Sequence, residues 1–199
     1  CTDFAASGIL LQTERCTDAV HLNRRDVEII GERGSFLSHN PVSNLKLNSG
    51  LFAFEDLYHR LPGKVTIGTD GASSNNNLSM IESVKFASLA AKCQADSATA
   101  GKAADVFRAA TSNGAAAFGL NAGEIREGAP ADCLLVDLNN PFMVPAYNLV
   151  SDLVYAADSS SIADVICNGR LVMEDRRVEG EAEIVAEARK LAEKIINLK

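Results

Sequence analysis

Short apolar runs alternate with amphipathic segments over the first 120 residues of the chain. Three apolar runs, at 19–20, 35–38 and 64–68, predict strands, and helical periodicity follows each of them. The predicted helices cover 26–33, 54–60, 78–92 and 103–111, with Gly34 ending the first and Pro62 the second. Strands that alternate with helices pair in parallel through crossover connections, so this region predicts a parallel α/β sheet.

The pattern changes to short strands after about Leu120. Strands are predicted at 133–137, 152–155, 164–167 and 170–173, and Asn168-Gly169 is a strong hairpin signal between the last two. Residues 181–198 then form an amphipathic helix, in which apolar residues recur every three or four positions. These patterns predict three units: residues 1–120, a small β-domain at 121–178, and a C-terminal helix at 179–199.

Composition and charge exclude several classes of protein. The chain has 199 residues, of which 47% are hydrophobic and 23% charged, as in an ordinary globular protein. The net charge is -7 and no block of Lys or Arg stands out, which argues against nucleic acid or an anionic membrane as partner. The five cysteines include no Cys-x-x-Cys pair, which favours reduced thiols and a cytoplasmic location.

The segment Ile67-Gly-Thr-Asp-Gly-Ala-Ser-Ser-Asn carries the strongest chemical signal. It places Asp70 at the C-terminal end of the 64–68 strand, directly before a glycine. Catalytic carboxylates of α/β folds lie at this position, but Asp-Gly is also a common turn pair. These residues alone leave both interpretations open. Ser73, Ser74 or Asn75 is predicted to cap the 78–92 helix.

Further motifs surround this segment in a particular order. The motifs are Ser38-His-Asn-Pro-Val-Ser-Asn-Leu-Lys-Leu47, Thr111-Ser-Asn-Gly-Ala-Ala-Ala-Phe-Gly-Leu120, Gly123-Glu-Ile-Arg-Glu-Gly-Ala-Pro-Ala-Asp132 and Val165-Ile-Cys-Asn-Gly-Arg170. In that order and spacing they resemble the C-terminal half of the amidohydrolase superfamily, in its deaminase and chlorohydrolase branch. The Asp70 segment is most similar to deaminases of S-adenosylhomocysteine and methylthioadenosine.

The resemblance implies an α/β fold: the C-terminal part of a (β/α)8 TIM barrel, with strands equivalent to the sixth to eighth, plus a small β-sandwich-like domain and a C-terminal helix. It also implies hydrolysis of a non-peptide C–N bond, as in deamination of an adenine-type heterocycle. In that family a divalent metal, zinc or iron, activates a water for attack on the ring. Asp70 corresponds to the eighth-strand Asp, a metal ligand that also moves the proton from water to the leaving group.

Other site residues follow from the same resemblance. His21 is the candidate for the sixth-strand catalytic histidine, although counting back from the following helix places Asp18 there instead. His39, Ser43 and Asn44 correspond to the loop after the seventh strand, which shapes the substrate pocket. An equally weighted alternative is that His39 has a structural role, with its ring facing inward and hydrogen-bonded to backbone groups. Ser73 and Ser74 are candidates for substrate contacts that also cap a helix.

The metal ligands of the family are incomplete in this chain. It has histidines only at 21, 39 and 59, and no His-x-His pair. One carboxylate cannot hold zinc, which takes three protein ligands at a catalytic site. We therefore expect the 199-residue chain alone to bind no catalytic metal, and expect it to be a fragment, since a complete barrel needs about 250 residues.

Two functional hypotheses follow. The chain is part of a metal-dependent deaminase, or it is a catalytically inactive, metal-free family member or fragment with a structural role. The expected partner is a small heterocyclic substrate. Three-eighths of a barrel leaves strand edges uncovered, so a homo-oligomer is also expected.

Overall fold

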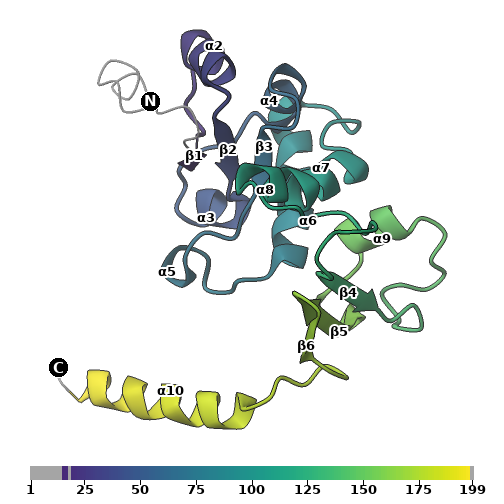
Figure 1. Cartoon of the computed structure of the whole chain (residues 1–199). Coiled ribbons are helices and arrows are strands. Elements are labelled where there is room, and N and C mark those ends of the chain that lie inside the picture. Colours follow the sequence, from purple (N-terminus) through teal and green to yellow (C-terminus); the bar gives the residue numbers. More distant parts are fainter. Residues whose placement is uncertain (1–14, 18, 198–199) are drawn as a thin grey trace.

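The computed structural model describes residues 15–17 and 19–197, and its first part is built on a three-stranded parallel sheet (Figure 1). The strands lie in the order β1 (Arg15–Thr17), β2 (Phe36–His39) and β3 (Val65–Ile67). Leu37 pairs with Cys16 on one side and Val65 on the other. The predicted parallel sheet is therefore confirmed. The strand predicted at 19–20 is wrong, because β1 ends at Thr17 and Ala19 lies beyond it as a buried loop residue.

Helices connect and cover these strands. Between β1 and β2 lies α2 (Arg24–Arg33); α3 (Pro41–Lys46) and α4 (Phe54–Arg60) separate β2 from β3. After β3 come α5 (Ala72–Asn75), α6 (Met80–Ala95), α7 (Ala103–Ala110) and α8 (Ser112–Ala117). The Asn23 side chain caps α2, which ends at Gly34 with φ of 68°, as predicted.

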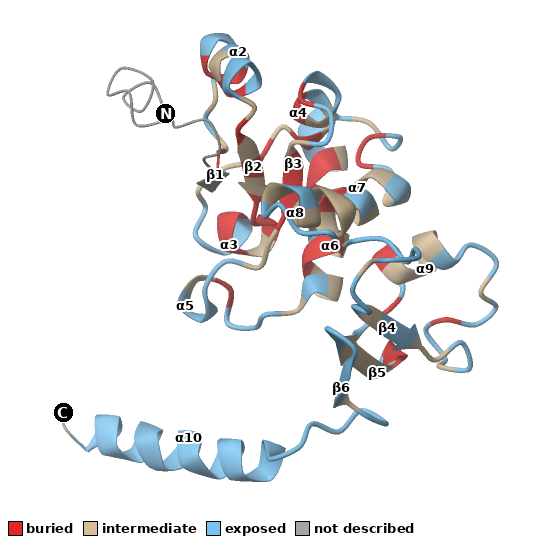
Figure 2. Ribbon diagram, viewed as in Figure 1, coloured by how far each residue is buried: buried red, intermediate tan, exposed pale blue. Residues whose placement is uncertain are grey.

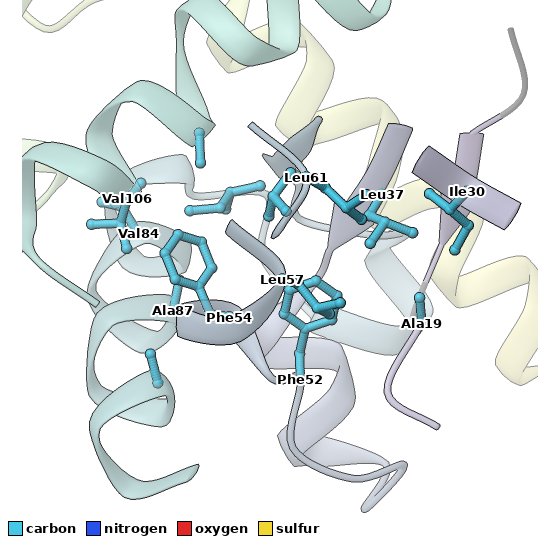
Figure 3. Close-up of a cluster of buried hydrophobic side chains, with 14 of the residues drawn as sticks. Ala19, Ile30, Leu37, Phe52, Phe54, Leu57, Leu61, Val84, Ala87 and Val106 are labelled. Carbon is cyan, nitrogen blue, oxygen red and sulfur yellow. The ribbon is translucent and has the colours of Figure 1, made fainter. Parts of the chain in front are cut away.

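The hydrophobic core lies between the sheet and α4, α6 and α7 (Figure 3). Leu37 and Val65 from the strands are fully buried, as are Phe54, Ala87 and Val106 from the three helices. Figure 2 shows buried residues concentrated in this part of the molecule. All three residues of β3 are buried, as in a strand covered on both faces, whereas burial alternates along β2, where Leu37 and His39 are the buried residues.

The second part contains a three-stranded antiparallel sheet, in the order β4 (Cys133–Val136), β5 (Ile162–Cys167) and β6 (Arg170–Met173). The Asn168-Gly169 hairpin joins β5 to β6, as predicted, with both residues at positive φ. Within the described residues this region is one sheet, with no second layer of a sandwich. The strand predicted at 152–155 is wrong. That segment belongs to α9 (Leu149–Tyr155), which the Asn148 side chain caps by accepting from the Ser151 backbone N–H.

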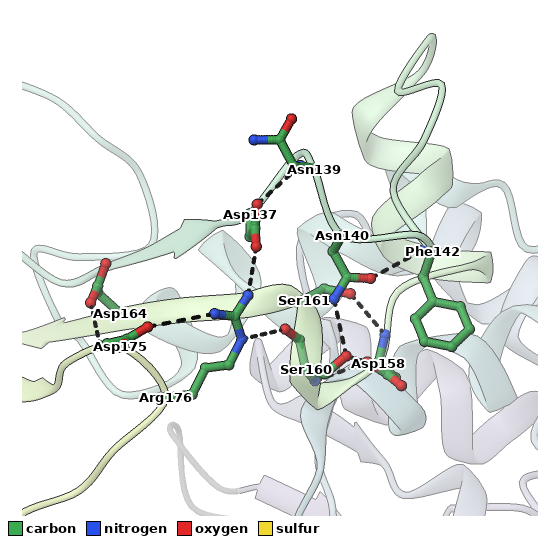
Figure 4. A network of polar contacts seen from close by, with 10 residues as sticks. All are labelled: Asp137, Asn139, Asn140, Phe142, Asp158, Ser160, Ser161, Asp164, Asp175 and Arg176. Atoms are coloured by element: carbon green, nitrogen blue, oxygen red, sulfur yellow. Dashed lines mark hydrogen bonds and ion pairs between the residues drawn. The ribbon is translucent and has the colours of Figure 1, made fainter.

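A polar network closes the loops of this second part (Figure 4). The Arg176 guanidinium donates to the Asp137 carboxylate at 2.7 Å and to the backbone carbonyl of Ser160 at 2.8 Å. Ser160 lies in the 3-10 turn η1 (Ser159–Ser161), directly before β5. Arg176 therefore joins the end of β4, the turn before β5 and the loop after β6. The chain then ends in α10 (Glu181–Ile196), which lies apart from both sheets (Figure 1).

Candidate active site around Asp70

Asp70 follows β3 in a backbone conformation that places its carboxylate at the surface. Pairing with β2 continues one residue past the strand, since the Gly68 N–H donates to the His39 carbonyl at 2.9 Å. A Cβ at Gly68 would lie 2.6 Å from the Asn40 Oδ1, so any larger residue here would displace the buried Asn40 side chain. Asp70 itself has φ of 60°, a left-handed conformation that Asp tolerates better than most residues, and it is exposed.

Two hydrogen bonds fix both oxygens of the Asp70 carboxylate. The Ser43 hydroxyl donates to Oδ2 at 2.6 Å, and the Gly71 backbone N–H donates to Oδ1 at 2.7 Å. The hydrogen bond from Ser43 makes the largest contribution to lowering the pKa of Asp70 below its ordinary value. The Gly71 N–H contributes next, and Ser74 has a smaller effect. Asp70 is therefore an ionised, oriented carboxylate at neutral pH, as a general base requires.

The short helix α3 supports the Asp70 loop. Pro41 starts α3, because proline fits the first helical turn. Ser43 is buried on α3, and its hydroxyl is directed at Asp70. Three residues later, the Lys46 ammonium donates to the Ser73 carbonyl at 2.9 Å. Sequence reasoning assigned Ser43 to substrate contacts and did not identify its hydrogen bond to Asp70.

The remaining residues of the Asp70 loop divide into buried and exposed groups. Ser73 is exposed on α5, whereas Ser74 is half-buried and slightly lowers the pKa of Asp70. Asn75 is buried, and its side-chain amide donates to the Thr69 carbonyl at 2.7 Å, which closes the loop. The prediction that one of these three residues caps the long helix is wrong, because α6 begins later, at Met80, and Ser79 is its N-cap. The substrate contacts of Ser73 and Ser74 stay a prediction.

His39 lies at the end of β2, beneath the Asp70 loop. It is 2% exposed, and its ring stacks on Phe52 with the centroids 4.5 Å apart. Within the described residues neither ring nitrogen of His39 has a hydrogen-bond partner. The alternative prediction, an inward-facing His39 that hydrogen-bonds to backbone groups, is therefore right about burial and wrong about the hydrogen bonds. Burial lowers the pKa of His39 to about 3, so the imidazole is neutral at physiological pH.

Asn44 is a second buried polar side chain of this site. It follows Ser43 on α3 and is 2% exposed, and among the described residues neither atom of its amide has a hydrogen-bond partner. Buried polar atoms that lack partners carry a desolvation cost, and active sites are one place where they occur. His39 and Asn44 therefore carry buried hydrogen-bonding groups without partners on β2 and α3, next to the Ser43 that binds Asp70; their place in a substrate pocket stays a prediction.

His21 is separate from this group. It is exposed in the segment after β1, and a Cβ at Gly50, between α3 and α4, would lie 3.2 Å from its Cε1. No hydrogen bond in the described part of the chain joins it to Asp70. The neighbouring residues Val20 and Leu22 line an open cleft of about 470 Å³ toward α2 and α4. The competing candidate, Asp18, lies outside the described residues, so the choice between the two stays open.

A catalytic metal requires more ligands than these residues provide. Among the residues that the structure describes, no three His, Cys, Asp or Glu side chains lie close enough together to hold a metal ion. Asp70 could supply one carboxylate oxygen, while zinc takes three protein ligands at a catalytic site. The described donor set therefore does not fit a complete zinc or iron centre.

Comparison with known proteins identifies the family. The model of the amidohydrolase family matches residues 2–172. The chain belongs to this family. It is 40% identical over 191 residues to the 5-methylthioadenosine/S-adenosylhomocysteine deaminase 1 of Archaeoglobus fulgidus, covering 94% of this chain and 45% of that protein. It is 42% identical over 191 residues to the 5'-deoxyadenosine deaminase of Methanospirillum hungatei, with 93% and 42% covered.

Solved structures of amidohydrolase proteins have the same fold. An adenosine deaminase from Xanthomonas campestris with bound zinc superposes with a TM-score of 0.92 at 34% identity, covering 98% of this chain and 45% of that one. Atrazine chlorohydrolase from Arthrobacter aurescens, complexed with zinc, superposes with a TM-score of 0.83 at 22% identity over 91% and 41%. The amidohydrolase chain described here spans less than half the length of these proteins.

No described helix is long and apolar enough to span a membrane.

Proposed function

We propose that this chain forms part of a metal-dependent deaminase that hydrolyses the C–N bond to an exocyclic amino group of an adenine-type nucleoside. The supporting observation is the Asp70 carboxylate at the end of β3, ionised and held by Ser43 and Gly71. Relatives at 40–42% identity are deaminases of methylthioadenosine, S-adenosylhomocysteine or 5'-deoxyadenosine. Their names support a purine nucleoside as the substrate class.

In this proposal β1, β2 and β3 are the sixth, seventh and eighth strands of a barrel, within a unit that covers residues 1–120. Residues 121–178 then form the small β-domain, and residues 179–199 the C-terminal helix. The parallel order of the strands and the superposition on the Xanthomonas deaminase support this assignment. Asp70 would be one ligand of the divalent metal. The other ligands would have to come from outside the described residues, so the isolated chain is proposed to hold no catalytic metal.

The chemistry that we propose for this chain's own residues is proton transfer. The Asp70 carboxylate accepts a proton from the attacking water and delivers it to the departing amine, so that the amino group leaves as ammonia. Ser43 keeps the carboxylate oriented, and its hydrogen bond favours the ionised form that accepts the proton. Ser73, Ser74, His39 and Asn44 are proposed to shape the pocket around the ring. His21 is the proposed second proton-transfer group.

The test is a chimera in which this chain replaces the matched 45% of the Archaeoglobus fulgidus deaminase. Ammonia release from adenine nucleosides should be measurable, and Asp70→Asn should lower turnover by about 10²–10⁴-fold because an amide is not a useful base. Asp96→Asn is the matched control. Asp96 is also exposed and also left-handed, with φ of 47°, but it lies at the C-terminal end of α6, away from the Asp70 loop. Its variant should retain full activity.

The inactive alternative makes the opposite prediction. It is favoured by the absence of a His-x-His pair from the sequence and of a three-residue metal group from the described residues. A folded, zinc-loaded chimera without deaminase activity would support this alternative. An active chimera whose Asp70→Asn variant stays within a few-fold of the parent would show that Asp70 only forms a turn.

A further inference from the structure

The helix α10 presents an apolar stripe that nothing in the described structure covers. Ile184, Ala188, Leu191 and Ile195 recur at spacings of four, three and four residues, which places them on one face. Every residue of α10 is exposed (Figure 2), and Ile184 and Ile195 are 64% and 63% exposed. A 16-residue helix with no tertiary packing is marginal in water, so a partner for this face would stabilise it considerably.

The charges along α10 indicate which partner fits. The first half carries three acids, Glu181, Glu183 and Glu187, and no base. The second half is net basic, with Arg189, Lys190 and Lys194 against the single acid Glu193. A second copy of α10 laid antiparallel would place the acidic half of each helix beside the basic half of the other. A parallel copy would align like charges and like ends of the helix dipoles.

The apolar positions agree with the same orientation. In an antiparallel pair, Ile184 faces Ile195 of the second copy, and Ala188 faces Leu191, so that each large residue in the centre meets a small one. Glu187 and Lys194 flank the stripe on the same side and meet each other across the pair. The arrangement is two-fold symmetric, since each contact occurs twice, as a closed dimer requires.

We propose that α10 is a dimerisation element that binds α10 of a second copy of this chain in an antiparallel two-helix coiled coil. The interface is the stripe Ile184, Ala188, Leu191 and Ile195, and its orientation is set by the Glu187–Lys194 pairs. The assignment does not depend on the proposed catalytic activity. It places the interface of the expected homo-oligomer on α10 rather than on the open strand edges.

Sedimentation equilibrium of the full 199-residue chain tests the stripe. The wild-type chain should dimerise reversibly in the micromolar range, and Leu191→Asp should weaken dimerisation at least tenfold by placing a charge in the apolar seam. Ala186→Asp is the matched control, because Ala186 lies on the opposite face of α10. It should leave the dissociation constant unchanged. Circular dichroism checks that both variants keep the fold of the two sheets.

Charge exchange tests the orientation. Glu187→Lys and Lys194→Glu should each weaken the dimer several-fold, since each creates two like-charge contacts, and the double exchange should restore it. A chain that stays monomeric, or a dimer insensitive to Leu191→Asp, would overturn the proposal, the latter pointing to association through a sheet edge. Lack of rescue by the double exchange would overturn the antiparallel geometry.

Discussion

His39 combines deep burial with a titratable ring, which makes the stability of the protein depend on pH. Its pKa is lowered from 6.5 to about 3 because burial disfavours the charged form. Below about pH 6.5 the unfolded chain takes up a proton at this residue, and the folded chain does not until about pH 3. The contribution of His39 to stability is therefore complete above pH 6.5 and decreases as the pH falls towards 3.

We expect this effect in the free energy of unfolding. His39 should add a loss of up to about 1.4 kcal/mol per pH unit between roughly pH 6 and pH 4. His39→Phe retains an aromatic ring against Phe52 and should remove this component, measured by denaturant titration at several pH values. His59→Phe, at an exposed position of α4, is the control; it removes only a surface pair with Glu55 and should change the slope much less than His39→Phe. Equal slopes for the wild type and His39→Phe would contradict a neutral, buried His39.

At the scale of elements, local signals predicted those segments whose own sequence sets their boundaries. Gly34 ends α2 where predicted, and Asn168-Gly169 forms the hairpin, because each requires a left-handed backbone. Residues 152–155 were misread as a strand because Leu-Val-Tyr is also typical of strands. This segment is a helix because the Asn148 side chain caps its first turn and only one of its faces, at Val154, is buried.

In the candidate site, too, the features set by local sequence were predictable and those set by tertiary packing were not. The position of Asp70 follows from its strand and the glycine after it, so it was predictable. The Ser43 hydrogen bond was not, because it joins residues 27 positions apart, and only the three-dimensional register of β2 and β3 brings them together. Asn44 is buried on α3, a helix that the hydrophobic pattern did not predict because it is only six residues long and begins at Pro41.

Gly101 links several elements through the loop between α6 and α7. Its carbonyl accepts from the buried Ser88 hydroxyl at 2.6 Å, and its N–H donates to Glu55 at 2.8 Å. The same Ser88 hydroxyl lies 2.7 Å from the Tyr155 hydroxyl on α9. Gly101 has φ of 54°, and a Cβ there would lie 2.7 Å from the Ala91 Cβ and 3.0 Å from the Ser88 carbonyl oxygen.

Gly101→Ala should therefore destabilise the protein by about 2–4 kcal/mol, since backbone strain and steric overlap act together. Gly63→Ala is the matched control: φ is 71°, but nothing lies within 4 Å of the added Cβ. That variant should lose only about 1 kcal/mol, from backbone strain alone. Chemical denaturation of both variants measures the difference. Equal losses would show that the α6–α7 loop can move away from Ala91 and Ser88.

At the scale of the whole molecule, the two sheets belong to regions with different packing. The main hydrophobic cluster draws on residues between Ala19 and Ala110, joined by Val154 and Tyr155 from α9. The strands β4, β5 and β6 contribute nothing to it, and Leu134, Leu135, Leu171 and Val172 are all exposed. The polar network around Arg176 connects loops of the second region to one another. Local stability should therefore differ between the two regions.

Native-state hydrogen exchange should detect this difference. We expect backbone amides of β2, β3 and α6 to exchange much more slowly than those of β4, β5 and β6, because opening the second region exposes less buried apolar surface. Val84→Ala, in the main cluster, should speed exchange in the first region by about tenfold or more and leave the second unchanged. Ile162→Ala, buried at the start of β5, should do the reverse. Acceleration of both regions by either substitution would show that the protein opens as one cooperative unit, with α9 coupling the two sheets.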